Sequence, residues 1–415
     1  MRKFLGLVLV VMISLPADAQ PAGEAYGEKK AVKSIEKDVK TLADDKMEGR
    51  ETGTQGEALA AEYIAKRMEK LGLKPYGIGG YFQTFTFTPR ANPHAQEPPS
   101  SSGPIMGKNV IGYWDNGAAY TVVIGAHYDH LGKGGEGSLH AGEAAIHNGA
   151  DDNASGVAAM LELARMLSKS EDLKQSNYLF IAFSGEEKGL WGSKSFVANP
   201  TIPLNSVNYM INMDMVGRLD SNKLAINATG TSTKWEEALK AANTDDLELV
   251  QGESGIGPSD HTSFYLEDIP VLHFFTGQHS DYHKPSDDTE KVNMEGIKVV
   301  SDFIYRVMEH VQLHGKLDHQ ATKSNEQDTP RFKVTLGVMP DYMFQGNGMR
   351  IDGIIPDRPA EKAGLKRGDI VIKMGDVEIK DMQTYMQGLG QFETGDKATV
   401  VVKRGSEELE VVVEF

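Results

Sequence analysis

Two adjacent glutamates, Glu186 and Glu187, end the apolar run at the start of IAFSGEEKGLWGSKSF, residues 181–196. A carboxylate at the end of a buried strand is costly to desolvate, so a pair of them needs a chemical reason. Adjacent residues of an extended chain point to opposite sides. The two side chains can therefore do different work: one can bind a cation while the other moves a proton.

Further acidic and imidazole side chains stand where other apolar segments end or just before a helix. In an open parallel sheet, functional groups gather beyond the carboxyl ends of the strands. Any one of these residues alone is more often a helix cap, a turn residue or a structural histidine. Together they predict one shared site, and its candidates are His127, Asp129, Asp151, Asp152, Asp214 and His283.

Two imidazoles with several carboxylates make a set that can hold metal ions. Imidazole with carboxylate suits zinc, and less exclusively cobalt or manganese. A carboxylate can bridge two ions roughly 3.5–4 Å apart, which polarise both water and substrate. The chain has no cysteine, so a transition-metal site here uses His and carboxylates only, which favours catalytic over structural zinc. A free carboxylate is then needed as general base. This division of labour accounts for the glutamate pair.

The elements that must position these residues alternate between strand and helix. Continuous apolar strands interleaved with helices predict an α/β fold, with a mostly parallel central sheet flanked by helices. A helical region is also predicted over residues 31–73. The predicted strands are 109–114, 120–130, 177–187, 207–217, 223–230 and 269–277; the predicted helices are 155–169, with Ser155 as cap, 189–200 and 294–313.

The N-terminus has the pattern of a secretory signal peptide, residues 1–19. A basic MRK precedes the apolar FLGLVLVVMISL, and an A-x-A cleavage site follows at Ala17–Ala19. The apolar run is too short to span a bilayer. We therefore expect an exported protein, periplasmic or secreted, without a membrane span. The net charge of −16 argues against a nucleic-acid partner.

The motifs AHYDH, GADDNASG, FSGEEKGLWGS, NMDMVG and DYHKPSDD, in this order, resemble those of the di-zinc aminopeptidase family. That family also contains glutaminyl cyclases and glutamate carboxypeptidases. The segment EGRETGTQGEALAAEYIAKRMEKLGLKP is similar to its N-terminal helix signature. The resemblance covers roughly residues 30–313 and implies a zinc peptidase domain with the zinc exopeptidase fold.

The resemblance also implies roles for single residues. Two Zn²⁺ ions are expected on five ligands: Asp151 as the bridge, His127 and Asp214 for one ion, and Glu187 and His283 for the other. Glu186 is expected as general base and acid, and Asp129 as the group that orients His127 through its other ring nitrogen. Tyr282 matches a tyrosine that in some members helps to hold the oxyanion.

Two further segments leave their roles open. The motif SDHTSF places Asp260 and His261 where they are expected to shape the pocket without binding metal. The Gly-rich stretch between Asp129 and Asp151 contains His140 and His147. Either histidine could contact a metal, but we favour a mobile rim loop.

The C-terminal part has a different texture. A polar linker is expected at residues 314–330, followed by a small β-rich domain at 331–415 that resembles a PDZ domain of the bacterial exported-protease type. The resemblance implies a loop that receives the C-terminal carboxylate of a peptide ligand. The alternative is a domain that only packs against its neighbour. The expected loop residues are Leu336, Gly337, Val338 and Met339.

The sequence thus predicts an exported zinc exopeptidase that removes N-terminal residues from peptides with a free N-terminus. A hydroxide bridging the two zincs would attack, with Glu186 as general base. The alternatives are a dipeptidase, a glutaminyl cyclase, or an inactive peptide-binding scaffold.

Overall fold

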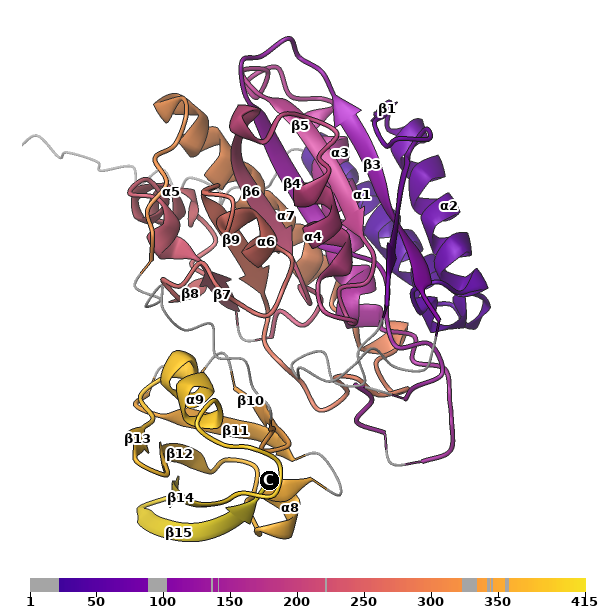
Figure 1. Cartoon of the computed structure of the whole chain (residues 1–415). Helices are drawn as coiled ribbons and strands as arrows, with labels where there is room; N and C mark the ends of the chain where they lie inside the picture. The colour runs from indigo at the N-terminus through magenta and orange to yellow at the C-terminus, as the bar shows by residue number, and fades with distance from the viewer. Residues whose placement is uncertain are drawn as a thin grey trace, which may run out of the picture.

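The computed structural model describes residues 22–88, 103–135, 137–140, 142–220, 222–322, 334–341, 344, 346–354 and 358–415. The predicted signal peptide lies outside these residues, as do most of the Pro-rich loop at 89–104 and part of the predicted linker. A large domain built on one sheet comes first in the chain, and a small β-rich domain follows it (Figure 1).

The large domain is built on a nine-stranded mixed sheet. In spatial order its strands are β1 (Lys74–Pro75), β3 (Ile105–Trp114), β5 (Asn177–Phe183), β4 (Thr121–His127), β6 (Val207–Met213), β9 (Val271–Phe275), β7 (Lys223–Asn227) and β8 (Glu248–Gln251), with β2 (Phe82–Phe87) beside β3. The central strands β5, β4, β6 and β9 are parallel, whereas β3 and β7 run antiparallel to their neighbours in this group. The polar residues that follow the central strands therefore meet at one edge of the sheet.

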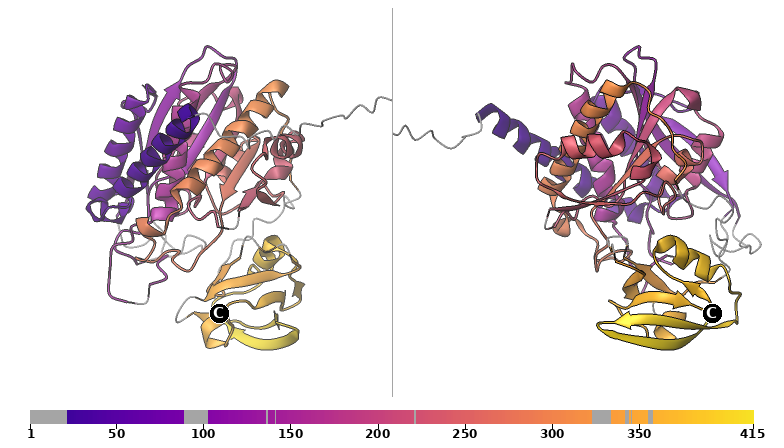
Figure 2. Two further views of the ribbon diagram at one scale, coloured as in Figure 1. Left: turned by 180° about the vertical axis from the view of Figure 1, so that it is seen from behind. Right: turned by 90° about the vertical axis from the view of Figure 1, so that its left-hand side faces the viewer.

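Every residue of β4, β5, β6 and β9 is buried. This agrees with their continuous apolar sequence, which is typical of strands covered on both faces. One face packs on α1 (Ala22–Leu42), α2 (Gln55–Lys70), α3 (Gly156–Leu167), α5 (Trp235–Ala242) and α7 (Met294–Val311). The other face packs on α4 (Trp191–Ala198) and α6 (His261–Tyr265), so helices cover both sides (Figure 2). The predicted α/β class is confirmed.

The helical region predicted over residues 31–73 is two helices with a break between them. Helix α1 ends at Leu42, and the short η1 (Asp45–Arg50) contains left-handed residues at Glu48, Gly49 and Arg50. Thr54 caps α2 by accepting a hydrogen bond from the main-chain N–H of Glu57. The sequence has helical periodicity on both sides of the break, so periodicity alone did not predict where the first helix ends. The break matters because it places buried polar side chains against the site described below.

The predicted linker starts as part of the large domain. The main-chain N–H of Leu317 donates to the side chain of Asn208, at 2.7 Å, and Gln320 donates to the carbonyl of Thr231, at 2.8 Å. The main-chain N–H of Thr322 donates to the hydroxyl of Tyr265, at 2.9 Å. Residues 315–322 are therefore held on the large domain.

The small domain is a six-stranded antiparallel sheet with two short helices. Its elements are β10 (Val338–Pro340), β11 (Met349–Ile354), α8 (Pro359–Lys362), β12 (Ile370–Met374), β13 (Val377–Glu378), α9 (Met382–Leu389), β14 (Lys397–Arg404) and β15 (Glu407–Glu414). Strand β15 lies at one end of the strand order and pairs with β14. Among the helices of the described residues, none has the length and apolar character needed to cross a bilayer.

Candidate metal centre

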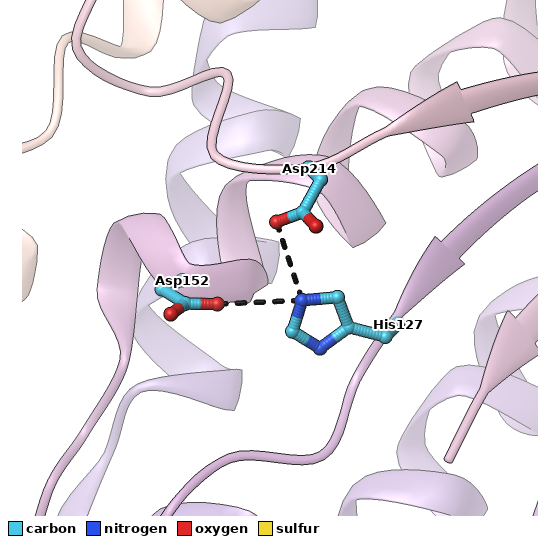
Figure 3. A group of neighbouring side chains, drawn as sticks. All are labelled: His127, Asp152 and Asp214. Carbon is cyan, nitrogen blue, oxygen red and sulfur yellow. Dashed lines mark hydrogen bonds and ion pairs between the residues drawn. The ribbon is translucent and has the colours of Figure 1, made fainter. Parts of the chain in front are cut away.

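His127, the last residue of β4, faces two carboxylates (Figure 3). Its Nε2 atom lies 3.2 Å from Oδ1 of Asp214 and 3.3 Å from Oδ1 of Asp152. Asp214 directly follows β6, and Asp152 lies in the turn η2 (Ala150–Ser155) that leads into α3. Three segments far apart in sequence thus converge at the carboxyl edge of the sheet.

The other oxygen of Asp152 faces a second cluster. Oδ2 of Asp152 lies 3.2 Å from Nε2 of His283, and that nitrogen is also 3.2 Å from Oε2 of Glu187. His130 completes the cluster, with its Nδ1 atom 2.7 Å from Oε1 of Glu187 and 3.8 Å from Oδ2 of Asp152. Asp152 therefore stands between two imidazole-carboxylate groups.

These donor sets fit zinc. Bonds of about 2.0–2.2 Å in a tetrahedron put neighbouring donor atoms about 3.3–3.6 Å apart. The Nε2 atoms of His127 and His283 lie 3.2–3.3 Å from carboxylate oxygens of two residues each. Charge-assisted N–H···O bonds are usually shorter, about 2.7–2.9 Å. Within the described part of the chain, at least three donor atoms come together in two groups: His127, Asp152 and Asp214; and His130, Asp152 and Glu187. The 2.7 Å between His130 and Glu187 is a hydrogen-bond distance, so His283 fits the second donor set better than His130 does.

Asp151, expected as the bridging ligand, does not lie between these clusters, and this expectation is corrected in favour of Asp152. One oxygen of Asp151 accepts from the main-chain N–H of Gly217, at 2.6 Å, and the other is 3.1 Å from Nε2 of His279. The main-chain N–H groups of Asp151 and Asp152 both donate to Asp287, at 3.0 Å. In this turn the two side chains diverge, so the DD pair alone could not identify the bridge.

The imidazoles of the two clusters keep the carboxyl groups beside them ionised. Burial opposes ionisation of Asp152, yet the nearby imidazoles of His130, His127 and His283 hold its pKa well below the ordinary value. Burial likewise opposes ionisation of Glu187, but His283 and His130 lower the pKa of its carboxyl group to about 2. Both carboxylates are therefore ionised across the physiological range, as ligands of a cation must be.

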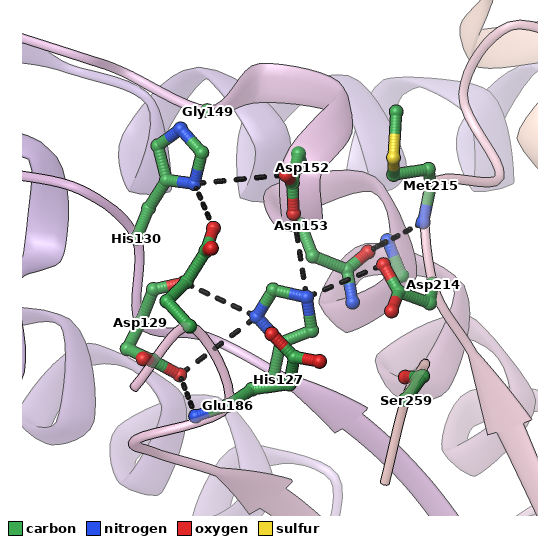
Figure 4. A network of polar contacts seen from close by, with 12 residues as sticks. His127, Asp129, His130, Gly149, Asp152, Asn153, Glu186, Asp214, Met215 and Ser259 are labelled. Atoms are coloured by element: carbon green, nitrogen blue, oxygen red, sulfur yellow. Dashed lines mark hydrogen bonds and ion pairs between the residues drawn. The ribbon is translucent and has the colours of Figure 1, made fainter. Parts of the chain in front are cut away.

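Glu186 has the opposite electrostatic character. Burial raises its pKa well above the ordinary value, and the charges of Asp214 and Glu187 add to this effect, while His127 opposes it. Its main-chain N–H donates to Oδ1 of Asp129, at 3.2 Å (Figure 4). The two adjacent glutamates thus have pKa values shifted apart, which is typical of a ligand next to a proton carrier.

Asp129 lies beside the Nδ1 atom of His127, and its main-chain oxygen is nearer to that nitrogen than its carboxylate is. Nδ1 of His127 is 3.2 Å from the main-chain oxygen of Asp129 and 3.8 Å from its carboxylate (Figure 4). A carbonyl that accepts from Nδ1 leaves Nε2 free to bind a cation. Burial raises the pKa of the Asp129 carboxyl to about 6.

The Gly-rich loop at residues 131–147 contacts His283 directly. The carbonyl oxygen of Gly137 is 2.8 Å from Nδ1 of His283, and Leu139 donates its N–H to the His283 carbonyl, at 2.9 Å. His147 is held within the loop, 2.8 Å from the Ser138 hydroxyl and 2.8 Å from the Ala145 carbonyl. The described part of the loop holds the ring of His283 in place, and the hydrogen bonds of His147 hold the loop itself together.

The remaining candidate residues lie around this centre. The ring of Tyr282 stacks on His283, with centroids 3.8 Å apart, and its predicted role at the oxyanion stays a prediction. Asp260 is buried, and burial raises the pKa of its carboxyl to about 7. His261 stacks on His273, at 4.6 Å. The rings of His140 and His147 are 6.2 Å apart.

Arg50 ties together the main chain around the centre. Its fully buried guanidinium donates to the carbonyls of Tyr128, Leu42, Asn148 and Gly149, at 2.7, 2.7, 2.5 and 2.9 Å. Burial lowers its pKa to about 10, although neighbouring carboxylates favour the charged form. Its fork of donors connects the loop after β4 with the turn that carries Asp152.

In the small domain, the predicted carboxylate loop is partly committed to internal contacts. Leu336 is buried in the core, and its carbonyl accepts from the N–H of Ala360, at 2.8 Å. Gly337 has φ of 75° and donates its N–H to the Thr335 hydroxyl, at 3.0 Å. Val338 and Met339 pair with β11. Peptide capture by this loop stays a prediction.

Sequence reasoning missed several residues that the structure places at the centre. Asp152 stood in the DD pair, and His130 in AHYDH, but neither was given a ligand role. The buried polar residues of the GRETG segment were visible only as part of a helix signature.

Two sequence profiles of known families match parts of the chain. Residues 109–308 match the sequence profile described as Peptidase family M28, and residues 317–415 match that of the PDZ domain. The chain therefore carries a domain of Peptidase family M28 followed by a PDZ domain. With the His and carboxylate set, this supports a zinc hydrolase.

Among curated relatives, the chain is 31% identical over 199 residues to aminopeptidase YwaD of Bacillus subtilis, covering 44% of this chain and 39% of the relative. It is 26% identical over 249 residues to the uncharacterized protein YfbL of Escherichia coli, covering 52% and 73%. The chain thus spans about two fifths of the length of the first relative and about three quarters of the second.

Two solved structures share the fold. An aminopeptidase from Aneurinibacillus sp. strain AM-1 superimposes with a TM-score of 0.52 at 19% identity, covering 72% of this chain and 98% of the other. A glutaminyl cyclase from Bacteroides thetaiotaomicron gives a TM-score of 0.54 at 19% identity, covering 67% and 97%. At this identity the likeness concerns the fold alone.

Proposed function

We propose that this chain is an exported zinc aminopeptidase that releases N-terminal residues from peptides. The observation that carries the proposal is the position of Asp152. Its Oδ1 is 3.3 Å from Nε2 of His127, and its Oδ2 is 3.2 Å from Nε2 of His283. A carboxylate with one oxygen toward each of two imidazoles suits a bridge between two cations.

In this proposal Asp152 serves two Zn²⁺ ions. His127 and Asp214 would complete the first set, and Glu187 and His283 the second. When bound, the ions would polarise the substrate carbonyl and lower the pKa of water. His130 would hold the second set by donating from Nδ1 to Glu187, which leaves the other oxygen of that carboxylate, 3.2 Å from His283, for the ion.

Glu186 is proposed as the residue that moves protons. The raised pKa of its carboxyl group lets it accept a proton at neutral pH and then return it to a leaving amine. Its backbone is fixed by Asp129, which favours one position of the side chain relative to the ligands. The negative charge of Asp214, and that of Glu186 in its ionised form, would favour an α-ammonium group, which supports an N-terminal specificity.

The two flanking parts of the chain extend the proposal. The N-terminal pattern of residues 1–19 favours export to the periplasm or medium. The PDZ domain is proposed to bind the C-terminus of a peptide, either the substrate or a separate partner.

The test compares the two glutamates. Glu186→Gln is expected to retain two zinc ions per chain and to lose turnover by about two to four powers of ten, the contribution of a general base. Glu187→Gln is expected to lose one zinc. Zinc is measured by elemental analysis, and turnover on aminoacyl substrates with free and acetylated N-termini. Equal zinc loss in both variants would contradict the assigned roles.

The same assays separate the alternative functions. Release of a free amino acid from unblocked peptides only is the expected result. Internal cleavage of acetylated peptides would indicate a general endopeptidase instead. Ammonia release from an N-terminal glutaminyl peptide without cleavage would indicate a glutaminyl cyclase, and a purified chain with neither activity nor zinc would indicate a scaffold.

A further inference from the structure

A buried chain of polar contacts runs from the start of α2 to the turn that carries Glu186. It begins at Thr52 and Glu57, whose side chains are 3% and 1% exposed. Both residues belong to the segment between the break after α1 and the first turn of α2. Nothing in the ligand set requires a carboxylate or a hydroxyl at these positions, yet burying them unpaired would be costly.

Both carboxylate oxygens of Glu57 accept hydrogen bonds from separate segments of the chain. Its Oε1 atom accepts from the Ser184 hydroxyl, at 2.6 Å, and from the main-chain N–H of Lys108, at 3.1 Å. The Tyr128 hydroxyl lies 3.2 Å from the same oxygen, and the N–H of Gly53 donates to Oε2, at 2.8 Å. Ser184 is the residue two positions before Glu186, so this carboxylate anchors the start of the glutamate turn.

Thr52 reaches the other side of that turn through Asp129. The Thr52 hydroxyl donates to Oδ2 of Asp129, at 3.0 Å, and Oδ1 of Asp129 accepts from the N–H of Glu186, at 3.2 Å. The hydroxyls of Thr52 and Ser184 lie 3.4 Å apart. Each hydroxyl has one proton: that of Thr52 is donated to Asp129 and that of Ser184 to Glu57. The two hydrogen bonds can therefore form at the same time.

We propose that Thr52 and Glu57 are positioning residues that fix Glu186, one through Asp129 and the other through Ser184. This inference rests on the proposed role of Glu186. The left-handed Gly185, with φ of 73°, makes the turn a sharp one, and its two flanking residues are the points held by the network. A carboxyl group placed this way needs no reorganisation before it accepts a proton.

The test replaces the Thr52 hydroxyl in the full-length zinc-loaded protein. Thr52→Val keeps the shape but removes the donor to Asp129, and Thr52→Ser keeps the donor. We expect Thr52→Val to lower kcat about tenfold with little change in KM and with both zincs retained, because supporting contacts of this kind are worth about 10- to 100-fold. Thr52→Ser is expected to restore kcat to within about twofold of the original value.

Thr54→Val provides a matched control. Thr54 caps α2 and donates to the Glu51 carbonyl, at 2.6 Å, so its loss weakens the same helix without breaking the bond to Asp129. It is expected to lower the melting temperature while kcat stays within about twofold. An equal fall of kcat in the Thr54 and Thr52 valine variants would overturn the proposal and leave only an anchor for α2.

A second measurement does not depend on turnover. Amide hydrogen exchange at Glu186 is expected to be about tenfold faster in Thr52→Val than in Thr52→Ser, because Asp129 no longer holds the Glu186 N–H firmly. Unchanged exchange with lowered kcat would place the effect elsewhere and overturn the proposed route. If the unaltered protein releases no amino acid, the proposed function fails, while the exchange result still decides the positioning role of Thr52.

Discussion

Nδ1 of His283 lies 2.8 Å from the carbonyl oxygen of Gly137, and this contact joins the second imidazole of the centre to the Gly-rich loop. A carbonyl acceptor fixes the proton on Nδ1 and turns Nε2 toward Asp152 and Glu187. The loop expected as a mobile rim is therefore a support of a proposed metal ligand. Gly137 has φ of 88°, a conformation that other residues adopt only with strain.

Gly137→Ala is expected to weaken one zinc and leave the other in place. The added Cβ would lie 3.2 Å from the Leu131 side chain, and the strained backbone would shift the carbonyl that holds His283. We expect the affinity of the weaker zinc to fall about tenfold, measured by competition with a chromogenic chelator. Gly117→Ala is the control, because Gly117 has φ of 69° and open space around it. Equal effects of both substitutions would contradict a specific support role.

The two aspartates of the DD pair are expected to behave differently when each is replaced. Asp152→Asn removes an anionic ligand from both proposed sets, so both zincs should bind at least about tenfold more weakly. Asp151→Asn keeps an oxygen to accept from Gly217 and should retain both zincs. Elemental analysis after dialysis distinguishes the two results. Zinc loss from the Asp151 variant alone would restore the assignment suggested by the family resemblance.

The sequence predicted the site region well because strand ends converge by topology alone. His127 is the last residue of one apolar strand, Asp214 directly follows a second and Glu187 closely follows a third, and parallel strands bring such residues together. The choice between Asp151 and Asp152 depends on dihedral angles in a turn that has no regular period. The role of Arg50 could not be predicted for a related reason: its hydrogen-bond partners are main-chain carbonyls, which every residue type carries.

His130 is expected to control the second zinc without being required for the first. Its Nδ1 is 2.7 Å from Glu187, whereas the 3.2–3.3 Å contacts of the first set do not involve it. His130→Gln should weaken one zinc about 10- to 100-fold, followed by stepwise chelator titration. His314→Gln is the control, since His314 lies at an exposed position outside the loop that contacts His283. A simultaneous loss of both zincs in the His130 variant would count against this assignment.

The stacked pair of His261 and His273 is expected to make folding stability depend on pH. Burial lowers the pKa of His273 from 6.5 to about 4, and that of His261 falls well below its ordinary value. Between these pH values the unfolded chain binds protons that the folded chain does not. The free energy of unfolding should therefore be independent of these two histidines above about pH 6.5, and it should fall as the pH decreases toward 4.

His273→Asn tests this slope in the zinc-stripped protein, so that metal release does not contribute. Each unit of pKa difference corresponds to about 1.4 kcal/mol. Between about pH 6 and pH 4.5, the free energy of unfolding of the variant should therefore change with pH less steeply than that of the original protein, by up to about 1.4 kcal/mol per pH unit. Urea denaturation at several pH values measures it. His314→Asn, at an exposed position, should keep the original slope. Identical slopes in the His273 variant and the original protein would mean that His273 is not held neutral.

Removal of the PDZ domain is expected to spare small substrates if the cut respects residues 315–322. A chain that ends at Thr322 keeps the contacts to Thr231 and Tyr265, and every proposed ligand precedes Lys284. Its turnover of small aminoacyl substrates should stay within about twofold, whereas cleavage of longer peptides that engage the PDZ domain should fall.

A chain that ends at Gly315 is the informative comparison. It lacks Leu317, which is 6% exposed, and Asp318, which accepts from the Ser232 hydroxyl, at 2.9 Å, and from the N–H and hydroxyl of Thr233, at 3.2 and 3.0 Å. At about 1 kcal/mol for each of these three hydrogen bonds and about 1.5–3 kcal/mol for the buried leucine, its stability should fall by about 4–6 kcal/mol. Chemical denaturation of the two truncated chains measures the difference. If the chain ending at Thr322 keeps its stability and both zincs yet loses small-substrate turnover, the PDZ domain completes the active site and the two parts do not act as separate modules.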